Sequence, residues 1–271
     1  MLGRRLVNGV ESTGVAVDDR GLQYGDGLFE TMAAVDGRIR HFGLHLARLD
    51  EGCRRLRIPV PAADQLEHEC SRVLEGLGAA TVKLIVTRGP GPRGYRPPAE
   101  PSVSRIVMSS AARPRSEHTA ITVRICETRL GQNRLLAGLK HLNRLEQVMA
   151  CSEWDDPAIA EGLMLSMDGR LICATAANLF LVRGGCLVTP DVRDCGVAGV
   201  MRRLVLDIAA RIDIPARVED LRPESLGQAD EVFLTNAVAG IRPVGEILGT
   251  GRWAAGDVTR ALAAAAAMED A

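Results

Sequence analysis

The sequence lacks several features that mark common classes of protein. Aromatic side chains make up only 3% of its 271 residues, which argues against a surface that stacks the bases of single-stranded nucleic acid. Acidic and basic residues nearly cancel, to a formal charge of −1, so no general attraction to nucleic acid or to an anionic membrane is expected. Lysine is also scarce, because only Lys83 and Lys140 occur among the 33 basic residues.

Segments that direct a chain to a membrane are missing as well. Residues 1–10 contain two arginines but no apolar core of a signal peptide, and no apolar run approaches the length that spans a bilayer. The seven cysteines are an odd, scattered set without C-x-x-C spacing. They indicate neither a zinc site nor a redox pair, and no metal is expected. Reduced thiols are typical of the cytoplasm, which is the predicted location.

What the chain does contain is a mixture of two hydrophobic periodicities, which predicts an α+β fold. Asn8-Gly9 and Asp36-Gly37 are typical hairpin turns between strand-like runs, whereas residues 42–58 carry apolar residues at helical spacing. The expected strands are 5–10, 28–35, 38–40, 82–88, 103–109, 121–126, 163–167, 171–174, 179–182, 186–189 and 231–235, and the expected helices are 42–58, 63–77, 142–152, 200–212 and 253–268.

A polar segment that contains Pro114 separates the two halves of the chain. We predict a small N-terminal α/β domain over residues 1–110, a linker over 111–118 and a larger C-terminal domain over 119–271. Within the first domain, residues 18–26 read as a polar loop, and residues 89–98 are too rich in glycine and proline for regular structure.

The two lysines are the candidates for covalent amine–carbonyl chemistry. An arginine stays protonated and forms no imine, so a Schiff base must use Lys83 or Lys140. Lys83 lies in an apolar, β-branched run that predicts a strand. Lys140 lies between a glycine turn and the predicted helix 142–152, from whose N-terminus it can project into a cleft between lobes. Most single lysines are solvated surface charges, but this abrupt change of pattern favours a functional Lys140.

Two further segments could bind anions. Residues 196–203 lead from a glycine-rich turn into a helix, where backbone N–H groups and the helix dipole favour phosphate; an ordinary helix cap is the more frequent explanation of such a turn. Arg88, Arg93 and Arg96 flank the loop at 89–98, and the guanidinium fork matches a carboxylate. An exposed basic loop explains these arginines equally well. Arg48, by position alone, is one more solvated charge.

Residues 140–148 have the sequence KHLNRLEQV, which closely resembles the lysine motif of 4-amino-4-deoxychorismate lyases. These are pyridoxal-phosphate enzymes of fold type IV, related to D-amino-acid and branched-chain aminotransferases. Similar motifs cover nearly the whole chain: residues 19–31 (DRGLQYGDGLFET), 45–49 (HLARL), 87–95 (TRGPGPRGY), 176–180 (AANLF) and 199–202 (GVMR). The lysine motif is specific to the lyase branch, whereas GDG is not. The resemblance implies two lobes, a small N-terminal α/β lobe and a larger C-terminal lobe with a β-barrel-like core.

The resemblance also implies a role for each matched residue. Lys140 would form an imine with pyridoxal 5′-phosphate and then act as acid and base, with Thr31 assisting proton transfer. The implied cofactor-binding residues are Lys140, Arg48, Cys173, Asn178, Val200, Met201, Asn236 and Ala237, and the implied substrate-binding residues are Phe29, Arg93 and Tyr95. In relatives the loop matched by Arg93 and Tyr95 reaches a substrate carboxylate, often from the neighbouring subunit, so a homodimer is expected.

The sequence departs from the family's pattern at Cys173. In the family a glutamate at this position pairs with the pyridine nitrogen of the cofactor and keeps it protonated, so that the ring accepts electrons. A neutral thiol cannot hold a pyridinium as a carboxylate does. The departure weakens an aminotransferase interpretation more than a lyase interpretation, because the lyase reaction ends in an aromatic ring that supplies its own driving force.

The implied reaction converts 4-amino-4-deoxychorismate to 4-aminobenzoate and pyruvate in folate biosynthesis, through an external aldimine of the substrate with the cofactor. A first alternative is a D-amino-acid or branched-chain aminotransferase, which has the same fold and cofactor. A second alternative, motivated by Cys173, is a cofactor-binding protein of weak activity.

Overall fold

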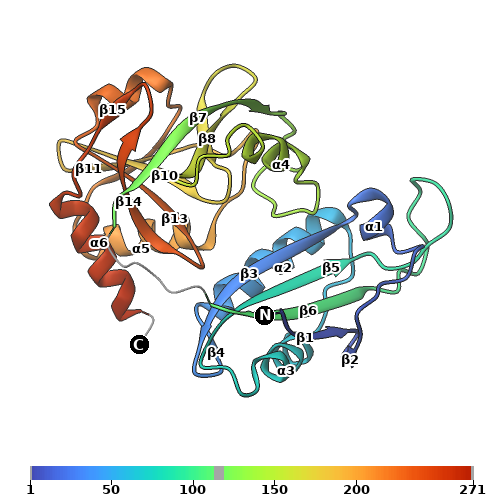
Figure 1. Cartoon of the computed structure of the whole chain (residues 1–271). Coiled ribbons are helices and arrows are strands. Elements are labelled where there is room, and N and C mark those ends of the chain that lie inside the picture. Colours follow the sequence, from blue (N-terminus) through green and yellow to red (C-terminus); the bar gives the residue numbers. More distant parts are fainter. Residues whose placement is uncertain (1, 113–118, 270–271) are drawn as a thin grey trace. The chain divides into compact units, whose positions relative to one another are not determined.

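Two β-sheets, each with its own helices, make up the computed structural model, which describes residues 2–112 and 119–269 (Figure 1). The contacts divide the chain into two units. The first is Met1–Pro114 with Leu139–Asn143, and the second is Arg115–Gly138 with Arg144–Ala271. Most of the predicted linker, residues 113–118, lies outside the described residues. No helix in the described part of the chain is long and apolar enough to cross a membrane.

The first unit is built on an antiparallel sheet in the order β2-β1-β6-β5-β3-β4. Its elements are β1 (Leu2–Val7), β2 (Val10–Glu11), α1 (Arg20–Tyr24), β3 (Gly27–Val35), β4 (Arg38–Ile39), α2 (Phe42–Leu56), α3 (Ala63–Leu74), β5 (Ala79–Thr87) and β6 (Ser104–Ala111). Both predicted hairpin turns are confirmed. Asn8 and Gly9 have φ values of 51° and 78°, and Asp36 and Gly37 have 49° and 75°, as two-residue hairpin turns require.

One face of this sheet forms the core with α2 and α3. Strand β3 alternates, because Leu28 and Met32 are buried with the helices while Phe29 and Thr31 are only half-buried. This period of two follows from the pleat of a strand. The half-buried face, opposite α2 and α3, also carries Lys83, which is the register partner of Thr31 on β5.

The predicted polar loop at residues 18–26 is wrong in part, because it contains the short helix α1. The side chain of Asp19 caps this helix by accepting a hydrogen bond from the Gly21 N–H at 2.8 Å. Gly25 ends it with a φ of 65°, and a Cβ there would lie 2.5 Å from Asn143 Oδ1. A helix of five residues is too short to show a hydrophobic period, so only its caps identify it.

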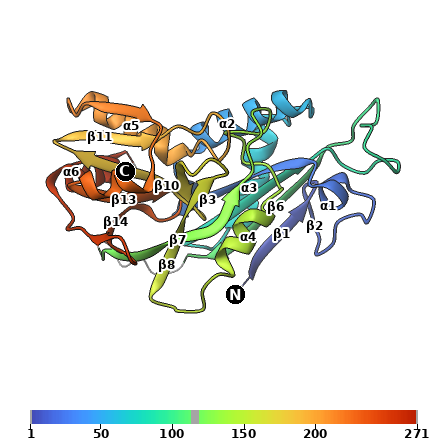
Figure 2. The same cartoon turned by 90° about the horizontal axis from the view of Figure 1, so that it is seen from above.

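The second unit holds a nine-stranded sheet in the order β12-β11-β10-β13-β14-β7-β8-β9, with β15 paired to β14. Figure 2 shows these strands with α5 and α6 next to them. Its elements are β7 (Ile121–Leu130), α4 (Leu145–Cys151), β8 (Ile159–Ser166), β9 (Leu171–Ala174), β10 (Asn178–Arg183), β11 (Cys186–Pro190), α5 (Val200–Arg211), β12 (Ala216–Glu219), η1 (Pro223–Gln228), β13 (Glu231–Asn236), β14 (Gly240–Ile247), β15 (Gly251–Arg252) and α6 (Asp257–Met268).

Strand β10 explains why this half of the sequence is so apolar. Leu179 and Leu181 enter one core cluster, while Phe180 enters a second cluster that packs against α5 and α6. There the Phe180 ring stacks on Phe233 with centroids 5.0 Å apart. Because both faces of β10 are covered, its sequence is a continuous apolar run rather than an alternating one.

The predicted helix at 142–152 is shorter than expected, because α4 begins at Leu145. Residues 139–143 are instead an extended segment that pairs with the start of β3. The Phe29 N–H donates to the Lys140 carbonyl at 3.0 Å, and the Leu142 N–H donates to the Gly27 carbonyl at 3.0 Å. Lys140 therefore belongs to the first unit, whereas the predicted domain scheme places it in the C-terminal domain.

Candidate active site

Both lysines of the chain lie against the same aromatic ring. The Lys140 ammonium is 4.3 Å from the centroid of the Phe29 ring, and the Lys83 ammonium is 5.3 Å from it. Cations favour the face of an aromatic ring at such distances. The two candidate imine-forming residues, 57 positions apart in the sequence, are thus brought together in the first unit by Phe29.

Strand pairing puts a hydroxyl on this same sheet face. Thr31 follows Phe29 by two residues and therefore points to the same side of β3. On β5, Thr31 is paired with Lys83 and Phe29 with Ile85. The face thus combines an amine from the segment 139–143, a hydroxyl from β3 and a cation from β5. Sequence reasoning found Thr31 and Phe29 by resemblance, but considered Lys83 only as an alternative imine former.

A buried ionic network fixes Arg48, the predicted phosphate-binding residue, against β3. Arg48 Nε donates to Glu30 Oε1 at 2.8 Å, and its Nη2 donates to Glu30 Oε2. The second oxygen also accepts a bond from His45 Nδ1 at 2.6 Å. Arg48 is therefore not a solvated charge, because the carboxylate of Glu30 defines where its guanidinium lies.

Burial opposes ionisation of Glu30, but its hydrogen bonds outweigh that effect. Burial alone would raise the pKa of the Glu30 carboxyl, whereas His45 and Arg48 lower it, and the net pKa lies below the ordinary value of 4.5. The carboxylate is thus ionised and paired at neutral pH.

The loop at residues 89–98 exposes two of the predicted substrate-binding side chains. Tyr95 is 86% exposed, and Arg93 is also exposed. Arg88 differs, because it is buried and donates to Asp26 at 2.8 and 3.0 Å and to the carbonyls of Leu56 and Arg57. The interpretation of Arg88 as a carboxylate-recognition residue is therefore wrong, since its donors hold the fold together.

The predicted phosphate-binding turn of the second unit is the start of α5. No side chain caps this N-terminus, where Gly199 precedes Val200 and Met201. A Cβ on Gly199 would lie 2.0 Å from Asn178 Oδ1, and Asn178 Nδ2 donates to the Val197 carbonyl at 2.9 Å. Asn178 therefore fixes the conformation of the turn. The first backbone N–H groups of this twelve-residue helix receive no side-chain cap, so they could bind an anion.

Asn236 is the last residue of β13, and Ala237 begins the turn that leads to β14. Asn236 Oδ1 accepts the backbone N–H groups of Val238 at 3.0 Å and Ala239 at 2.7 Å, and its Nδ2 donates to the Ala176 carbonyl at 3.3 Å. The side chain thus shapes its own turn and ties it to the segment that precedes Asn178. Its role in the structure is to position backbone.

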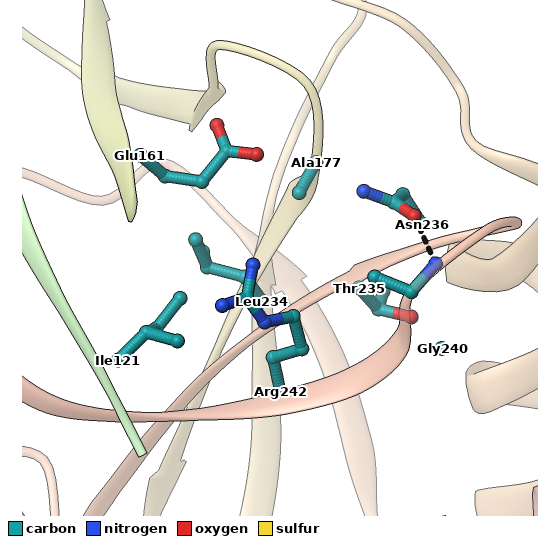
Figure 3. Close-up of a pocket in the computed structure, with 9 residues that line it drawn as sticks. Ile121, Glu161, Ala177, Leu234, Thr235, Asn236, Gly240 and Arg242 are labelled. Atoms are coloured by element: carbon teal, nitrogen blue, oxygen red, sulfur yellow. Dashed lines mark hydrogen bonds between the residues drawn. The ribbon is translucent and has the colours of Figure 1, made fainter. Parts of the chain in front are cut away.

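Glu161 and Arg242, which sequence reasoning missed, line a pocket in the second unit together with Ala177 and Asn236 (Figure 3). Glu161 accepts bonds from the Thr175 hydroxyl and from the Ala176 N–H. Burial raises the pKa of the Glu161 carboxyl, although these bonds and the charge of Arg242 lower it. A lone buried carboxylate gives no periodic signal, so the sequence offered no means to find it.

Cys173 is buried on β9 in a cluster that includes Cys126 and Cys195. Burial raises the pKa of this thiol to about 12, and the neighbouring Cys195 adds to the shift. The thiol is therefore neutral across the physiological range. The role of Cys173 beside a cofactor ring stays a prediction, in which the ring would meet a weak neutral donor and not a carboxylate.

Replacing Glu30 by glutamine tests the buried network. At neutral pH we expect Glu30→Gln to lower the free energy of unfolding by about 2–4 kcal/mol, because an uncharged amide leaves the half-buried Arg48 without its counter-charge. The pKa of Glu30 is lower in the folded state than its value of 4.5 in the unfolded chain, so its ionisation stabilises the fold above pH 4.5. This contribution is lost as the pH falls through the pKa of the folded state.

The difference in the free energy of unfolding between wild type and Glu30→Gln, measured by urea unfolding, should therefore become smaller below about pH 4.5. Glu51→Gln, at an exposed position of the same helix, is the control and should change the stability by less than about 0.5 kcal/mol. A difference for Glu30→Gln that stays constant down to pH 3 would contradict an ionised pair.

Comparison with known proteins identifies the family of the chain. The model of the class IV aminotransferase family matches residues 27–247. The aminodeoxychorismate lyase of Vibrio harveyi is 37% identical over 245 residues, which cover 89% of this chain and 90% of that protein. A putative branched-chain-amino-acid aminotransferase of Methanocaldococcus jannaschii is 33% identical over 243 residues, which cover 87% and 83%.

The crystal structure of 4-amino-4-deoxychorismate lyase from Pseudomonas aeruginosa has the same fold. It superposes with a TM-score of 0.88 and 47% sequence identity, over 95% of this chain and 96% of that one. The predicted α+β architecture of fold type IV is thereby confirmed. With a family model that matches most of its length, the chain belongs to the class IV aminotransferase family.

Proposed function

We propose that this protein is a 4-amino-4-deoxychorismate lyase, which releases 4-aminobenzoate and pyruvate in folate biosynthesis. The observation that carries the proposal is the position of Lys140, whose amine lies over Phe29 on the sheet face that also bears Thr31 and Lys83. This lysine is part of the motif KHLNRLEQV, and the lyases of Vibrio harveyi and Pseudomonas aeruginosa are among the most similar proteins.

The proposed cofactor is pyridoxal 5′-phosphate, which supplies an aldehyde for an amine and a ring that withdraws electrons. The residues present suit it at two places. Lys140 offers the amine, and the uncapped start of α5 offers backbone N–H groups for a phosphate. Position 199, just before α5, has no room for a residue larger than glycine. Arg48, Asn178, Asn236 and Ala237 complete the proposed set. Cys173 offers no carboxylate for the pyridine nitrogen.

Lys140 moves protons at both ends of the reaction. Its neutral Nζ takes the proton from the ring carbon that bears the substrate amine. The bond between the adjacent ring carbon and the enolpyruvyl oxygen then breaks, and the ring becomes aromatic. The protonated Nζ gives its proton to the methylene of the departing group, which leaves as pyruvate. The hydroxyl of Thr31 lies on the same face and holds the proton path in line.

Lys83 gives this face a positive charge for the substrate. The proposed substrate carries carboxylates, and the exposed Lys83 ammonium is 5.3 Å from the ring that Lys140 also contacts. An ammonium at this position attracts a carboxylate without forming the covalent link. Phe29, Arg93 and Tyr95 remain the other proposed substrate-binding residues.

An aminotransferase acting on D- or branched-chain amino acids is the first alternative, and the relative from Methanocaldococcus jannaschii motivates it. Its distinguishing property is an amino donor that leaves the cofactor in its amine form. A weakly active cofactor-binding protein is the second alternative. Cys173 motivates it, because a neutral thiol stabilises charge on the ring less than a carboxylate does.

A homodimer is the proposed assembly, in which the loop that bears Arg93 serves the neighbouring subunit. Helix α4 carries three exposed apolar side chains, since Val148 and Met149 lie one turn after Leu145. Their exposed fractions are 71% for Leu145, 56% for Val148 and 55% for Met149. Grouped apolar side chains of this kind are typical of an interface. The cytoplasm is the proposed location, since all seven cysteines are unpaired thiols.

Purified protein with pyridoxal phosphate and 4-amino-4-deoxychorismate should yield 4-aminobenzoate and pyruvate in equal amounts. Borohydride reduction of the loaded protein should attach the cofactor to the peptide that contains Lys140. Lys140→Ala should abolish both the yellow colour and the lyase activity. Lys83→Ala, the only other lysine variant, should keep the covalent link and raise KM, since only a charge is lost.

Two outcomes of this experiment would overturn the assignment. An adduct on the peptide of Lys83, or a yellow colour that survives in Lys140→Ala, would show that Lys140 is not the linking residue. Conversion of the cofactor to its amine form by amino donors, without any 4-aminobenzoate, would favour the aminotransferase.

Cys173→Glu tests how far the reaction depends on an electron-withdrawing ring. We expect this variant to raise the lyase kcat by less than about tenfold, or 1.4 kcal/mol, because aromatisation supplies most of the driving force. Cys173→Ser is the matched control that removes the thiol without adding a charge, and its kcat should stay within about twofold of wild type. No gain in Cys173→Glu, in a protein that unfolds at the wild-type temperature, would count against any contribution from the ring nitrogen.

The homodimer predicts a mass of twice 29.0 kDa in sedimentation equilibrium. Val148→Glu should weaken the association, because it puts a charge into the apolar patch on α4. Met167→Glu is the control, since Met167 is as exposed but lies in the turn between β8 and β9. A wild-type protein that sediments as a monomer at micromolar concentration would disprove the dimer.

A further inference from the structure

Arg20, a residue outside the proposed active site, holds the tip of the loop at residues 89–98. It is only 3% exposed. Its Nη1 donates to the Gly94 carbonyl at 2.9 Å and its Nη2 to the Tyr95 carbonyl at 3.0 Å. Its Nε donates to Asp26 at 3.0 Å, so the guanidinium is itself fixed by a carboxylate. One planar group thus ties the backbone of two consecutive loop residues to β3 and α1.

The aromatic side chains around Arg20 add to this grip. The guanidinium carbon lies 4.8 Å from the centroid of the Tyr24 ring. The Tyr24 hydroxyl accepts the Gly94 N–H at 3.0 Å, and the Tyr24 and Tyr95 rings meet edge to face with centroids 5.5 Å apart. Gly94 is therefore bound through both its N–H and its carbonyl, at a φ of 106° that favours glycine.

The foot of the loop is anchored by the same short helix. The Arg20 N–H donates to the Gly89 carbonyl at 3.0 Å, and the Gly91 N–H donates to the Asp18 carbonyl at 3.2 Å. Asp19, which is fully buried, accepts bonds from Thr87 and Ser104 on the two strands that the loop joins. A segment too rich in glycine and proline for regular structure is in this way held at its foot and at its tip.

Apart from the contact between the Tyr24 and Tyr95 rings, these interactions hold the backbone of the tip and leave its side chains exposed. Arg93 precedes the two carbonyls that Arg20 binds, and its side chain is exposed, as is that of Tyr95. A guanidinium on an ordered backbone loses less conformational entropy when it binds a carboxylate than one on a mobile loop. Ordering the tip therefore favours binding of a ligand by Arg93.

We infer that Arg20 is a positioning residue for substrate recognition, which holds the backbone of Gly94 and Tyr95 so that Arg93 is presented in one orientation to a substrate carboxylate. This inference rests on the proposed function, since it takes the loop at residues 89–98 as the substrate loop. Arg20 itself contacts no substrate and acts only through the loop.

Arg88 offers a matched control. It is buried, donates to the same Asp26 carboxylate, and its remaining donors bind two consecutive carbonyls, those of Leu56 and Arg57 at the end of α2. Arg20→Lys and Arg88→Lys each keep one charge for Asp26 and each lose the bonds to two carbonyls. They differ in the segment that is released, which is the loop tip for Arg20 and the end of α2 for Arg88.

The experiment measures loop mobility and catalysis on the same cofactor-loaded proteins. Trypsin cleaves after arginine, so a mobile tip should be cut between Arg93 and Gly94, whereas the bond after Arg96 resists because Pro97 follows. We expect Arg20→Lys to speed this cleavage and to raise KM for 4-amino-4-deoxychorismate, each on the order of tenfold, with kcat within about twofold. Arg88→Lys should lower the melting temperature without either change.

A double variant separates positioning from general damage. If Arg20 acts through Arg93, then Arg20→Lys combined with Arg93→Ala should have the same KM as Arg93→Ala alone. Additive effects on KM would overturn the inference, and so would faster cleavage without a change in KM. An unchanged rate of cleavage in Arg20→Lys would show that Arg20 does not order the loop tip. A loaded wild type without lyase activity would instead overturn the proposed function, and the substrate role of Arg20 with it.

Discussion

The pairing of residues 139–143 with the start of β3 is the interaction on which the proposed active site depends. Two backbone hydrogen bonds, between Phe29 and Lys140 and between Leu142 and Gly27, attach this segment to the first unit. A Cβ on Gly27 would lie 2.5 Å from the Val86 carbonyl oxygen on β5 and 2.9 Å from the Leu142 side chain, so glycine lets both neighbours approach. Without this pairing the Lys140 amine would have no fixed relation to Phe29 or to the face that carries Thr31.

Several buried or half-buried charges of the first unit hold backbone or other charges in place. Glu30 fixes Arg48, and Asp26 fixes both Arg20 and Arg88. Burial opposes ionisation of Asp26, but the two arginines outweigh it and keep the pKa of this carboxyl below its usual value. Truncating one partner of such a pair leaves a buried charge, which costs more than the pair contributes. The N-terminal motif is therefore a scaffold for the residues that the proposed chemistry uses.

Turn residues and hydrophobic periodicity are enough to predict the elements that form from interactions between neighbouring residues. The turns at Asn8-Gly9 and Asp36-Gly37, the helix α2 and the strand β5 follow from turn residues and periodicity. The apolar spacing predicts a helix that begins at Leu142, three residues before the observed start of α4 at Leu145. The spacing does not reveal that Leu142 pairs with Gly27 instead. The resemblance identifies Lys140 and Arg48 as proposed site residues. It could not reveal Arg20, because that role consists of contacts made 74 residues away.

Cys173 stands at the proposed position beside the cofactor ring nitrogen, and its neutral thiol would favour one reaction over another. An aminotransferase must place negative charge on the cofactor ring in both half-reactions, and a carboxylate partner of the ring nitrogen stabilises that charge. Burial keeps Cys173 protonated, with a pKa of about 12, so at the proposed cofactor site this stabilisation would be missing. A lyase that ends in an aromatic product loses less, because the electrons that leave the substrate carbon depart with the enolpyruvyl oxygen. With Cys173 in its proposed place, this departure from the family pattern therefore favours the lyase over an aminotransferase.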